Sequence, residues 1–244
     1  MEANRIKTLQ TTLPRGAPLA TATLASLGIS ASLAHAYVKS GWLEKLGRGT
    51  FMFAGDELKH SETLVFLEPR VPGLHVAAKT ALAWHGYRHN VAVTETTILW
   101  GDHRTELPEW LEDRFPVRYS SSRLFDENLP ADTGIAPMPE FLNGLRVSSP
   151  ERALLEMLSE VGVYQEVAEA RSIMEGLRQL RSHQLSLLLS HCRMVKAVRL
   201  CVVWARELNL SWAAQAREAA SGRMGSGRWI TRLKNGETLI LKSE

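Results

Sequence analysis

Residues 28–51 constrain the fold of this chain more than any other stretch, because they have the order of a turn, a short helix, a stop and a small basic hairpin. Gly28 is a natural end for a preceding helix, since glycine adopts the left-handed C-terminal conformation without a Cβ penalty. Ser30 can accept backbone N–H bonds and open a new helix, which we expect to run to about Lys39 and to stop at Ser40-Gly41. This order predicts a winged helix-turn-helix.

The hairpin that follows the helix is short and basic. Its strands are expected at Leu43–Leu46 and Thr50–Ala54, joined by Gly47-Arg48-Gly49, whose glycines permit the positive φ that a tight turn requires. Trp42 is expected to pack beneath the hairpin. The arginine at the tip of such a wing would meet phosphate or a minor groove.

Two helices are predicted before the turn. Apolar spacing indicates one over residues 6–13 and another over residues 18–27, with Pro14-Arg15-Gly16 between them. Thr21 or Thr23 could cap the start of the second helix. The first helix carries basic side chains that would add phosphate contacts and a salt-dependent affinity.

A recognition helix needs one buried face and one face that is short and polar enough to enter the major groove of DNA. We expect Leu33, Ala36 and Tyr37 to face the core. The small side chains of Ala31 and Ala34 would let the backbone approach the bases. The candidate DNA-binding residues are Arg5, Lys7, Ser30, Ser32, His35, Lys39, Lys45 and Arg48.

A second interpretation of the same pattern stays open. Segments that resemble a helix-turn-helix occur in many helical domains that never meet DNA, and short motifs have a high false-positive rate. His35 could equally be a surface histidine, and Ser30 could be only a helix cap. The basic hairpin and the basic first helix favour DNA binding.

The remainder predicts a larger, helix-rich unit of mixed α/β character, so the expected fold class is α+β, with domains at residues 1–56 and 57–244. Strands are expected at residues 91–100, 116–119 and 145–147, and a final hairpin at residues 229–233 and 238–241. Helices are expected at residues 60–67, 77–86, 164–177, 179–190 and 194–208.

The clearest helix start in this unit is Ser148-Ser149-Pro150-Glu151-Arg152-Ala153. A serine cap, a proline in the first turn and a glutamate that can close a capping box are typical of a helix N-terminus. Alternatively, Glu151 and Arg152 could form a buried pair that locks the unit. Both interpretations give the segment a structural role.

The composition fits a soluble globular protein, with 45% hydrophobic and 23% charged residues. No apolar run approaches the length of a membrane-spanning helix, and the start of the chain lacks a signal-peptide core, so we expect a cytoplasmic protein without a membrane partner. Cys192 and Cys201 are too few for a disulfide framework and are expected to be buried free thiols.

No catalytic or metal-binding signature is complete. His85 and His89 have a spacing that suits a metal, but Gly86 breaks the helix that would align them. Gly225-Ser226 is similar to the Gly-Ser of nucleotidyltransferases, but no Asp-x-Asp follows, so a two-metal site is missing. We therefore expect a protein that is not an enzyme, with no cofactor and no metal. A nuclease or nucleotidyltransferase is the weaker alternative.

Four blocks of the sequence carry a resemblance to a known family. Residues 40–49, 75–82, 107–111 and 148–156 resemble blocks of the AbiE-type antitoxins of bacterial type IV, or abortive-infection, toxin–antitoxin systems. The resemblance implies a winged helix that represses its own operon by binding operator DNA, and a C-terminal domain that neutralises a nucleotidyltransferase-like toxin. It implies DNA contacts on Ser30 to Lys39 and at Arg48, and no catalytic residues.

The net charge is distributed unevenly along the chain. It is +3 over residues 1–60, −6 over residues 61–192 and +7 over residues 193–234. Basic segments attract polyanions, and the acidic middle would suit a basic partner. The last basic stretch could form a second DNA surface or the face that binds the toxin. Its candidate residues are Lys196, Arg199, Arg206, Arg217, Arg223 and Arg228.

The sequence leaves two functions to be compared. The first is an antitoxin and autorepressor that binds its own promoter. The second is a non-catalytic interaction module, in which the winged helix is only a scaffold and the acidic middle or the basic C-terminus holds a partner.

Overall fold

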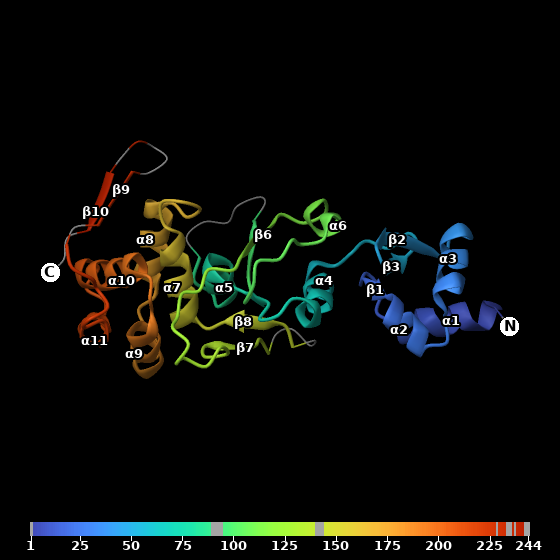
Figure 1. Ribbon diagram of the computed structural model, residues 1–244, viewed down its shortest axis with the longest axis horizontal. Coiled ribbons are helices and arrows are strands. Elements are labelled where there is room, and N and C mark those ends of the chain that lie inside the picture. The colour runs from blue at the N-terminus through green and yellow to red at the C-terminus, as the bar shows by residue number, and fades with distance from the viewer. Residues whose placement is uncertain are drawn as a thin grey trace. The chain divides into compact units, whose positions relative to one another are not determined.

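The computed structural model describes residues 2–88, 95–139, 144–227, 229–232, 236 and 238–241. Helices and sheets are both present, which confirms the α+β fold class (Figure 1). The chain forms two compact units, and the first draws on three stretches, Met1–Val71, Glu106–Phe115 and Pro139–Leu145. The second unit comprises Pro72–Thr105, Pro116–Met138 and Arg146–Glu244. The domain boundary expected between residues 56 and 57 stays a prediction.

The first unit is a winged helix-turn-helix followed by short helical segments. Its elements are α1 (Glu2–Thr12), β1 (Leu19–Ala20), α2 (Thr21–Ser26), α3 (Ala31–Lys39), β2 (Leu43–Gly47), β3 (Thr50–Phe53), α4 (His60–Leu67), the 3-10 helix η1 (Glu68–Arg70) and α6 (Glu109–Glu112). The strands form an antiparallel sheet in the order β1-β3-β2. Apolar side chains from α1, α2, α3 and the sheet form one core, which includes Ile6, Leu24, Tyr37 and Phe51.

The second unit is built on a five-stranded mixed sheet in the order β6-β5-β4-β8-β7. Its strands are β4 (His75–Val76), β5 (Thr97–Trp100), β6 (Val117–Ser120), β7 (Ile135–Pro137) and β8 (Arg146–Ser148). Its helices are α5 (Ala78–Trp84), α7 (Pro150–Glu160), α8 (Val167–Gly176), α9 (Ser182–His191), α10 (Val195–Glu207) and α11 (Ala213–Ala219). β9 (Trp229–Arg232) and β10 (Thr238–Leu241) form a separate antiparallel hairpin.

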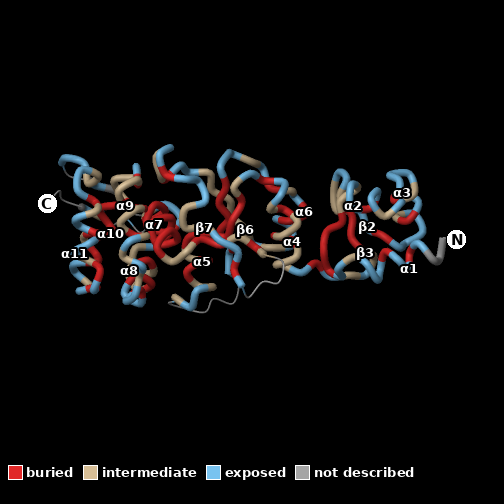
Figure 2. The backbone as a smooth tube through the Cα atoms, turned by 90° about the horizontal axis from the view of Figure 1, so that it is seen from below, coloured by how far each residue is buried: buried red, intermediate tan, exposed pale blue. Residues whose placement is uncertain are grey.

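α7 is the central helix of the second unit, and Figure 2 shows it buried along its length. The Ser149 side chain accepts from the backbone N–H of Arg152, as the predicted cap requires. The two charged residues at its start do not pair with each other. Glu151 binds Arg181, whose Nη2 lies 2.9 Å from Oε2, and Arg152 binds Glu156 at 2.9 Å. The first pair joins the start of α7 to the N-cap of α9, and the second lies within α7 itself.

Glu156 is the most deeply buried of these groups. Burial by itself would raise the pKa of this carboxyl, but hydrogen bonding and charge from His75, together with the charge of Arg152, outweigh it and lower the pKa to about 2. His75 Nε2 lies 3.2 Å from Oε1, and the backbone N–H of Ala78 donates to Oε2 at 3.0 Å. The carboxylate thus ties α7 to β4 and α5.

Several elements differ from their predicted limits. The helix expected from residue 18 begins at Thr21, because the preceding pair Leu19–Ala20 joins the sheet as β1 beside Thr50 and Phe51. Neither threonine caps that helix, since its N-cap is Ala20 and has no side-chain bond. The strand expected over residues 91–100 is observed at Thr97–Trp100, and residues 91–94 lie outside the described part of the chain.

Candidate nucleic-acid interface

The turn between α2 and α3 forms as predicted. Gly28 has a φ of +79°, and the N–H of Ile29 returns to Leu24 O at 3.0 Å, which buries the Ile29 side chain in the core. Ser30 is the N-cap of α3 and accepts from the N–H of Leu33 at 3.3 Å. The direction of α3 is therefore set by an apolar anchor and a polar cap on adjacent residues.

The buried face of α3 differs from the predicted one by one position. Ala34 and Tyr37 are buried, Leu33 is half-buried, and Ala36 is exposed. Because Ala34 packs in the core, it cannot let the backbone approach DNA bases, and that expectation was wrong. The exposed Ala31 keeps this role as a prediction.

The polar side of α3 is open to solvent. Ser30, Ser32, His35 and Lys39 are all exposed, and the hydroxyl oxygens of the two serines lie 3.0 Å apart. The His35 ring meets the Phe51 ring edge-on, with centroids 5.8 Å apart. His35 therefore connects α3 to β3 and still presents a polar edge to solvent.

The wing is a tight hairpin whose turn is Arg48-Gly49. Gly49 has the positive φ, +67°, that the turn requires. Gly47 does not have a positive φ and serves a different purpose, because a Cβ there would lie 3.1 Å from Cδ1 of Trp110. Glycine at this position lets the base of the wing pack against an indole ring.

Thr21 holds the wing turn against α2. Its backbone N–H and its hydroxyl both donate to the carbonyl of Gly49, at 2.9 and 3.0 Å. Thr21, which was expected as a possible helix cap, therefore acts as a clamp that fastens the wing turn to α2. Sequence reasoning missed this contact, and it missed Trp110, because neither pairing is visible in local spacing.

Trp42 does not pack beneath the hairpin as expected, since 47% of its surface is exposed. Its backbone is nevertheless fixed on both sides. Its N–H donates to Tyr37 O at 2.9 Å, and its carbonyl accepts from Ala54 at 3.1 Å. Trp42 is a rigidly placed exposed aromatic residue between α3 and the wing.

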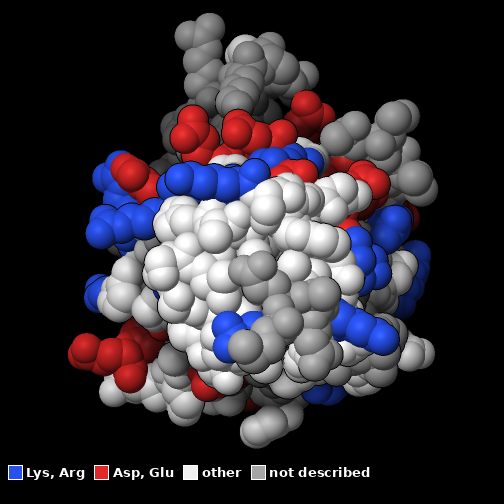
Figure 3. All heavy atoms as spheres, turned by 90° about the vertical axis from the view of Figure 1, so that its right-hand side faces the viewer, with Lys and Arg blue, Asp and Glu red and all other residues white. Residues whose placement is uncertain are grey.

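The predicted cationic contacts of the first unit are all exposed: Arg5 and Lys7 on α1, Lys39 on α3, Lys45 on β2 and Arg48 in the turn. Figure 3, which views the side of α1 and α3, shows uncharged surface between separate Lys and Arg side chains and no single dense cluster of them. Such a pattern suits separate phosphate contacts around a groove-facing surface better than one dense basic patch.

Arg15, a further cation of this unit, is held in place by Asp56. Arg15 Nε donates to the carboxylate at 2.8 Å, and the N–H of Gly16 adds a bond of 2.8 Å. The hydrogen bond from Arg15 is the main cause of the lowered pKa of Asp56. The contact between Arg15 and Asp56 therefore joins the segment before β1 to the segment after β3.

The predicted second basic surface is only partly exposed. Arg199 is buried and donates to Met224 O, Lys196 donates to Val161 O at 2.9 Å, and Arg223 binds Asp126 at 2.9 Å. Arg206 and Arg217 are exposed on α10 and α11. Arg228 lies outside the described residues. Three of the six candidates thus hold the second unit together.

The described residues contain no group of three or more His, Cys, Asp or Glu that could hold a metal ion. His89 of the possible metal pair is not among them. Cys192 and Cys201 are free and buried as predicted, and burial raises the pKa of Cys192 to about 11. Within the same ranges, no helix combines the length and apolar character needed to cross a membrane.

An exposed polar helix face, a capped turn and a clamped basic hairpin define the chain as a winged helix-turn-helix protein with a larger α/β unit. Residues 2–93 match the family model of the N-terminal domain of the AbiEi antitoxin transcriptional regulators, and residues 94–240 match that of the AbiEi antitoxin transcriptional regulators of type IV toxin–antitoxin systems. The chain therefore belongs to the AbiEi antitoxin family of transcriptional regulators.

A solved structure has the same fold. The crystal structure of the RV2827C protein from Mycobacterium tuberculosis aligns with 92% of this chain and 82% of its own, with a TM-score of 0.59 and 19% sequence identity. At this identity the likeness concerns the fold alone. A search of curated proteins gave no match.

Proposed function

We propose that the protein is a non-catalytic antitoxin that represses its own promoter, with α3 in the major groove of operator DNA and the β2–β3 turn against the backbone. The exposed face of α3 carries this proposal, because it is short and polar while its opposite face is anchored in the core by Ala34 and Tyr37. The family's description as transcriptional regulators supports the proposal.

The test is binding of the full-length protein to its own promoter, measured by fluorescence anisotropy at moderate salt. We expect Arg48→Ala and Lys39→Ala each to raise Kd by about 10-fold, the lower end of the range for one lost charge-assisted contact. Arg178→Ala removes the same charge from an exposed site in the second unit and should leave Kd unchanged.

If neither substitution changes the Kd for promoter DNA, the proposed DNA interface is wrong. No promoter binding at all by the wild-type protein would favour the alternative, an interaction module in which the winged helix is only a scaffold. The exposed Trp42 would then be the first side chain to examine at a protein interface, because aromatic residues are enriched there.

The antitoxin role has a separate test. We propose that the protein acts in the bacterial cytoplasm, where it counteracts a nucleotidyltransferase-like toxin. Growth of cells that express a nucleotidyltransferase reading frame next to this gene should be arrested, and co-expression of this protein should restore it. Unrelieved arrest would refute the antitoxin role even if promoter binding holds. Purified protein should show no metal-dependent nucleotide turnover.

A further inference from the structure

The second unit contains a cavity of about 490 Å³, and none of the proposed DNA-binding residues lines it. It lies where β5 and β6 end, next to α7 and the junction of α9 and α10. β5 and β6 are parallel, so their carboxyl ends meet at the same edge of the sheet. Such edges are where open α/β sheets commonly bind ligands, and this volume is typical of small-molecule sites.

Two arginines of the lining come from neighbouring extended segments. The N–H of Arg193 donates to Leu124 O at 2.8 Å, and the N–H of Asp126 donates to His191 O at 2.9 Å, so the segment that carries Arg123 runs beside the segment that carries Arg193. Trp100 Nε1 fixes the first segment through Ser122 O at 3.0 Å. Both guanidinium groups therefore start from rigid backbone.

These two arginines are exposed and make no polar side-chain contact within the described ranges, in a lining that also contains the carboxylates Asp102, Asp126 and Glu127. Neither the Arg123 nor the Arg193 side chain has a hydrogen-bond or ion-pair partner there. The adjacent carboxylate, Asp126, is already occupied by His191 Nδ1 at 2.8 Å and Arg223 Nη2 at 2.9 Å. Two cationic side chains in the lining of one cavity can bind an anionic ligand, and Arg recognises phosphate well through its planar fork.

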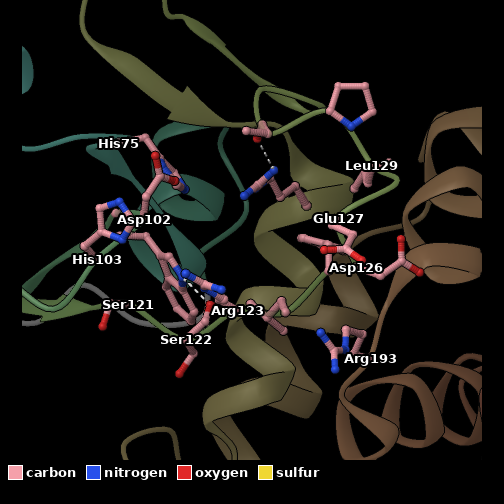
Figure 4. A pocket seen from close by; sticks show the side chains of 17 residues that line it. His75, Asp102, His103, Ser121, Ser122, Arg123, Asp126, Glu127, Leu129 and Arg193 are labelled. Atoms are coloured by element: carbon pink, nitrogen blue, oxygen red, sulfur yellow. Dashed lines mark hydrogen bonds between the residues drawn. The ribbon is translucent and has the colours of Figure 1, made fainter.

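The remaining lining suits a ligand that is larger than an inorganic anion. Leu124, Phe125 and Leu129 supply apolar surface. Figure 4 shows Asp102 and His103 on one side of the cavity and Glu127 and Arg193 on the other. The carboxylates can accept hydrogen bonds from hydroxyl or amino groups. The lining thus suits a ligand that has an anionic end, a polar middle and an apolar ring.

We propose that this cavity binds a phosphate ester of mononucleotide size, either a nucleotide or a sugar phosphate, with its phosphate at Arg123 and Arg193. The buried Arg152 shapes the inner wall and is not the anion site. Its Nε is used by Glu156, and its Nη1 donates to the carbonyls of Ala131 and Thr133 at 3.1 and 2.8 Å. The proposal is independent of DNA binding.

Isothermal titration of the full-length protein tests this site with AMP, UMP, ribose 5-phosphate, adenosine and inorganic phosphate as probes. We expect at least one ester to bind, and Arg123→Ala and Arg193→Ala each to weaken it by about 10-fold or more. Arg178→Ala, an exposed arginine outside the cavity, is the matched control and should bind as the wild type does. Circular dichroism and urea unfolding of each variant serve as the check that the second unit is folded.

The probes separate the sources of the ligand. Tighter binding of AMP or UMP than of ribose 5-phosphate supports a nucleotide, and equal binding supports a sugar phosphate. Inorganic phosphate or adenosine binding as tightly as the esters would overturn the proposal. So would an equal loss in Arg178→Ala, or the absence of binding by every ester at millimolar concentration.

Discussion

Glu156 has no exposed surface, and donors on several elements surround it. Besides the bonds from His75, Ala78 and Arg152, the Ser148 hydroxyl donates to Oε2 at 2.8 Å. A buried carboxylate is tolerated when such donors replace its lost water. The single charge therefore joins β4, α5, β8 and α7 at the centre of the second unit.

Glu156→Gln should destabilise the second unit strongly. The substitution keeps the shape but leaves the charge of Arg152 buried without its partner, and breaking a buried pair costs about 3–5 kcal/mol. Urea unfolding followed by circular dichroism would measure the loss. Glu175→Gln, on the exposed side of α8, is the control and should change stability by less than about 0.5 kcal/mol.

The same carboxyl predicts a pH dependence. Its pKa falls from 4.5 in the ordinary state to about 2 in the folded protein, so its stabilisation is fully present above about pH 4.5 and is lost as the pH falls toward 2. The wild-type free energy of unfolding should therefore decline over this window, by about 3 kcal/mol from this group. Glu156→Gln should show a shallower decline, and an equal slope in both proteins would contradict the assignment.

At the scale of elements, the wing depends on α2 for its position. The Thr21 hydroxyl bond to Gly49 O is one of the two bonds from this residue that hold the turn. Thr21→Val keeps the shape and the backbone bond but removes the hydroxyl. We expect promoter Kd to rise about 3- to 5-fold, because Arg48 is then less well positioned.

Thr23→Val is the matched control for this prediction, since Thr23 is exposed on the same helix. It should leave Kd unchanged. Equal affinities of the wild type and Thr21→Val would show that the clamp does not position the wing, whatever the role of Arg48.

Elements with strong local signals could be predicted from the sequence. The Ser30 cap and Gly28 turn set α3, and Ser149-Pro150 sets the start of α7, because each signal lies within a few residues. The two-residue strands β1 and β4 were missed, because they are too short to show alternation and exist only through their partners.

In the candidate interface, too, features with a local sequence signal could be predicted and features that depend on tertiary contacts could not. The exposed polar residues of α3 could be predicted from helical spacing, but the burial of Ala34 and the exposure of Trp42 depend on tertiary packing. The basic stretch after residue 193 showed its charge in the sequence but not its partners. Arg223 finds Asp126 almost a hundred residues earlier, which no local pattern indicates.

At the scale of the whole molecule, charge predicts how DNA affinity responds to salt. Five exposed cations of the first unit are candidate phosphate contacts: Arg5, Lys7, Lys39, Lys45 and Arg48. If all five neutralise phosphates, log K should fall with log salt with a slope of about −4.5. Arg48→Ala should reduce the magnitude of the slope by about 1, and an unchanged slope would place Arg48 away from phosphate.

The contact between Gly47 and Trp110 sets an order of events during synthesis. The wing leaves the ribosome 63 residues before the indole that supports its base, a delay of about 3–13 s at ordinary elongation rates. A nascent chain that has exposed residues 1–56 therefore already carries α3 and the turn but not the support of the wing. The support of the wing is therefore complete only after Pro72–Thr105, the first stretch of the second unit, has been synthesised.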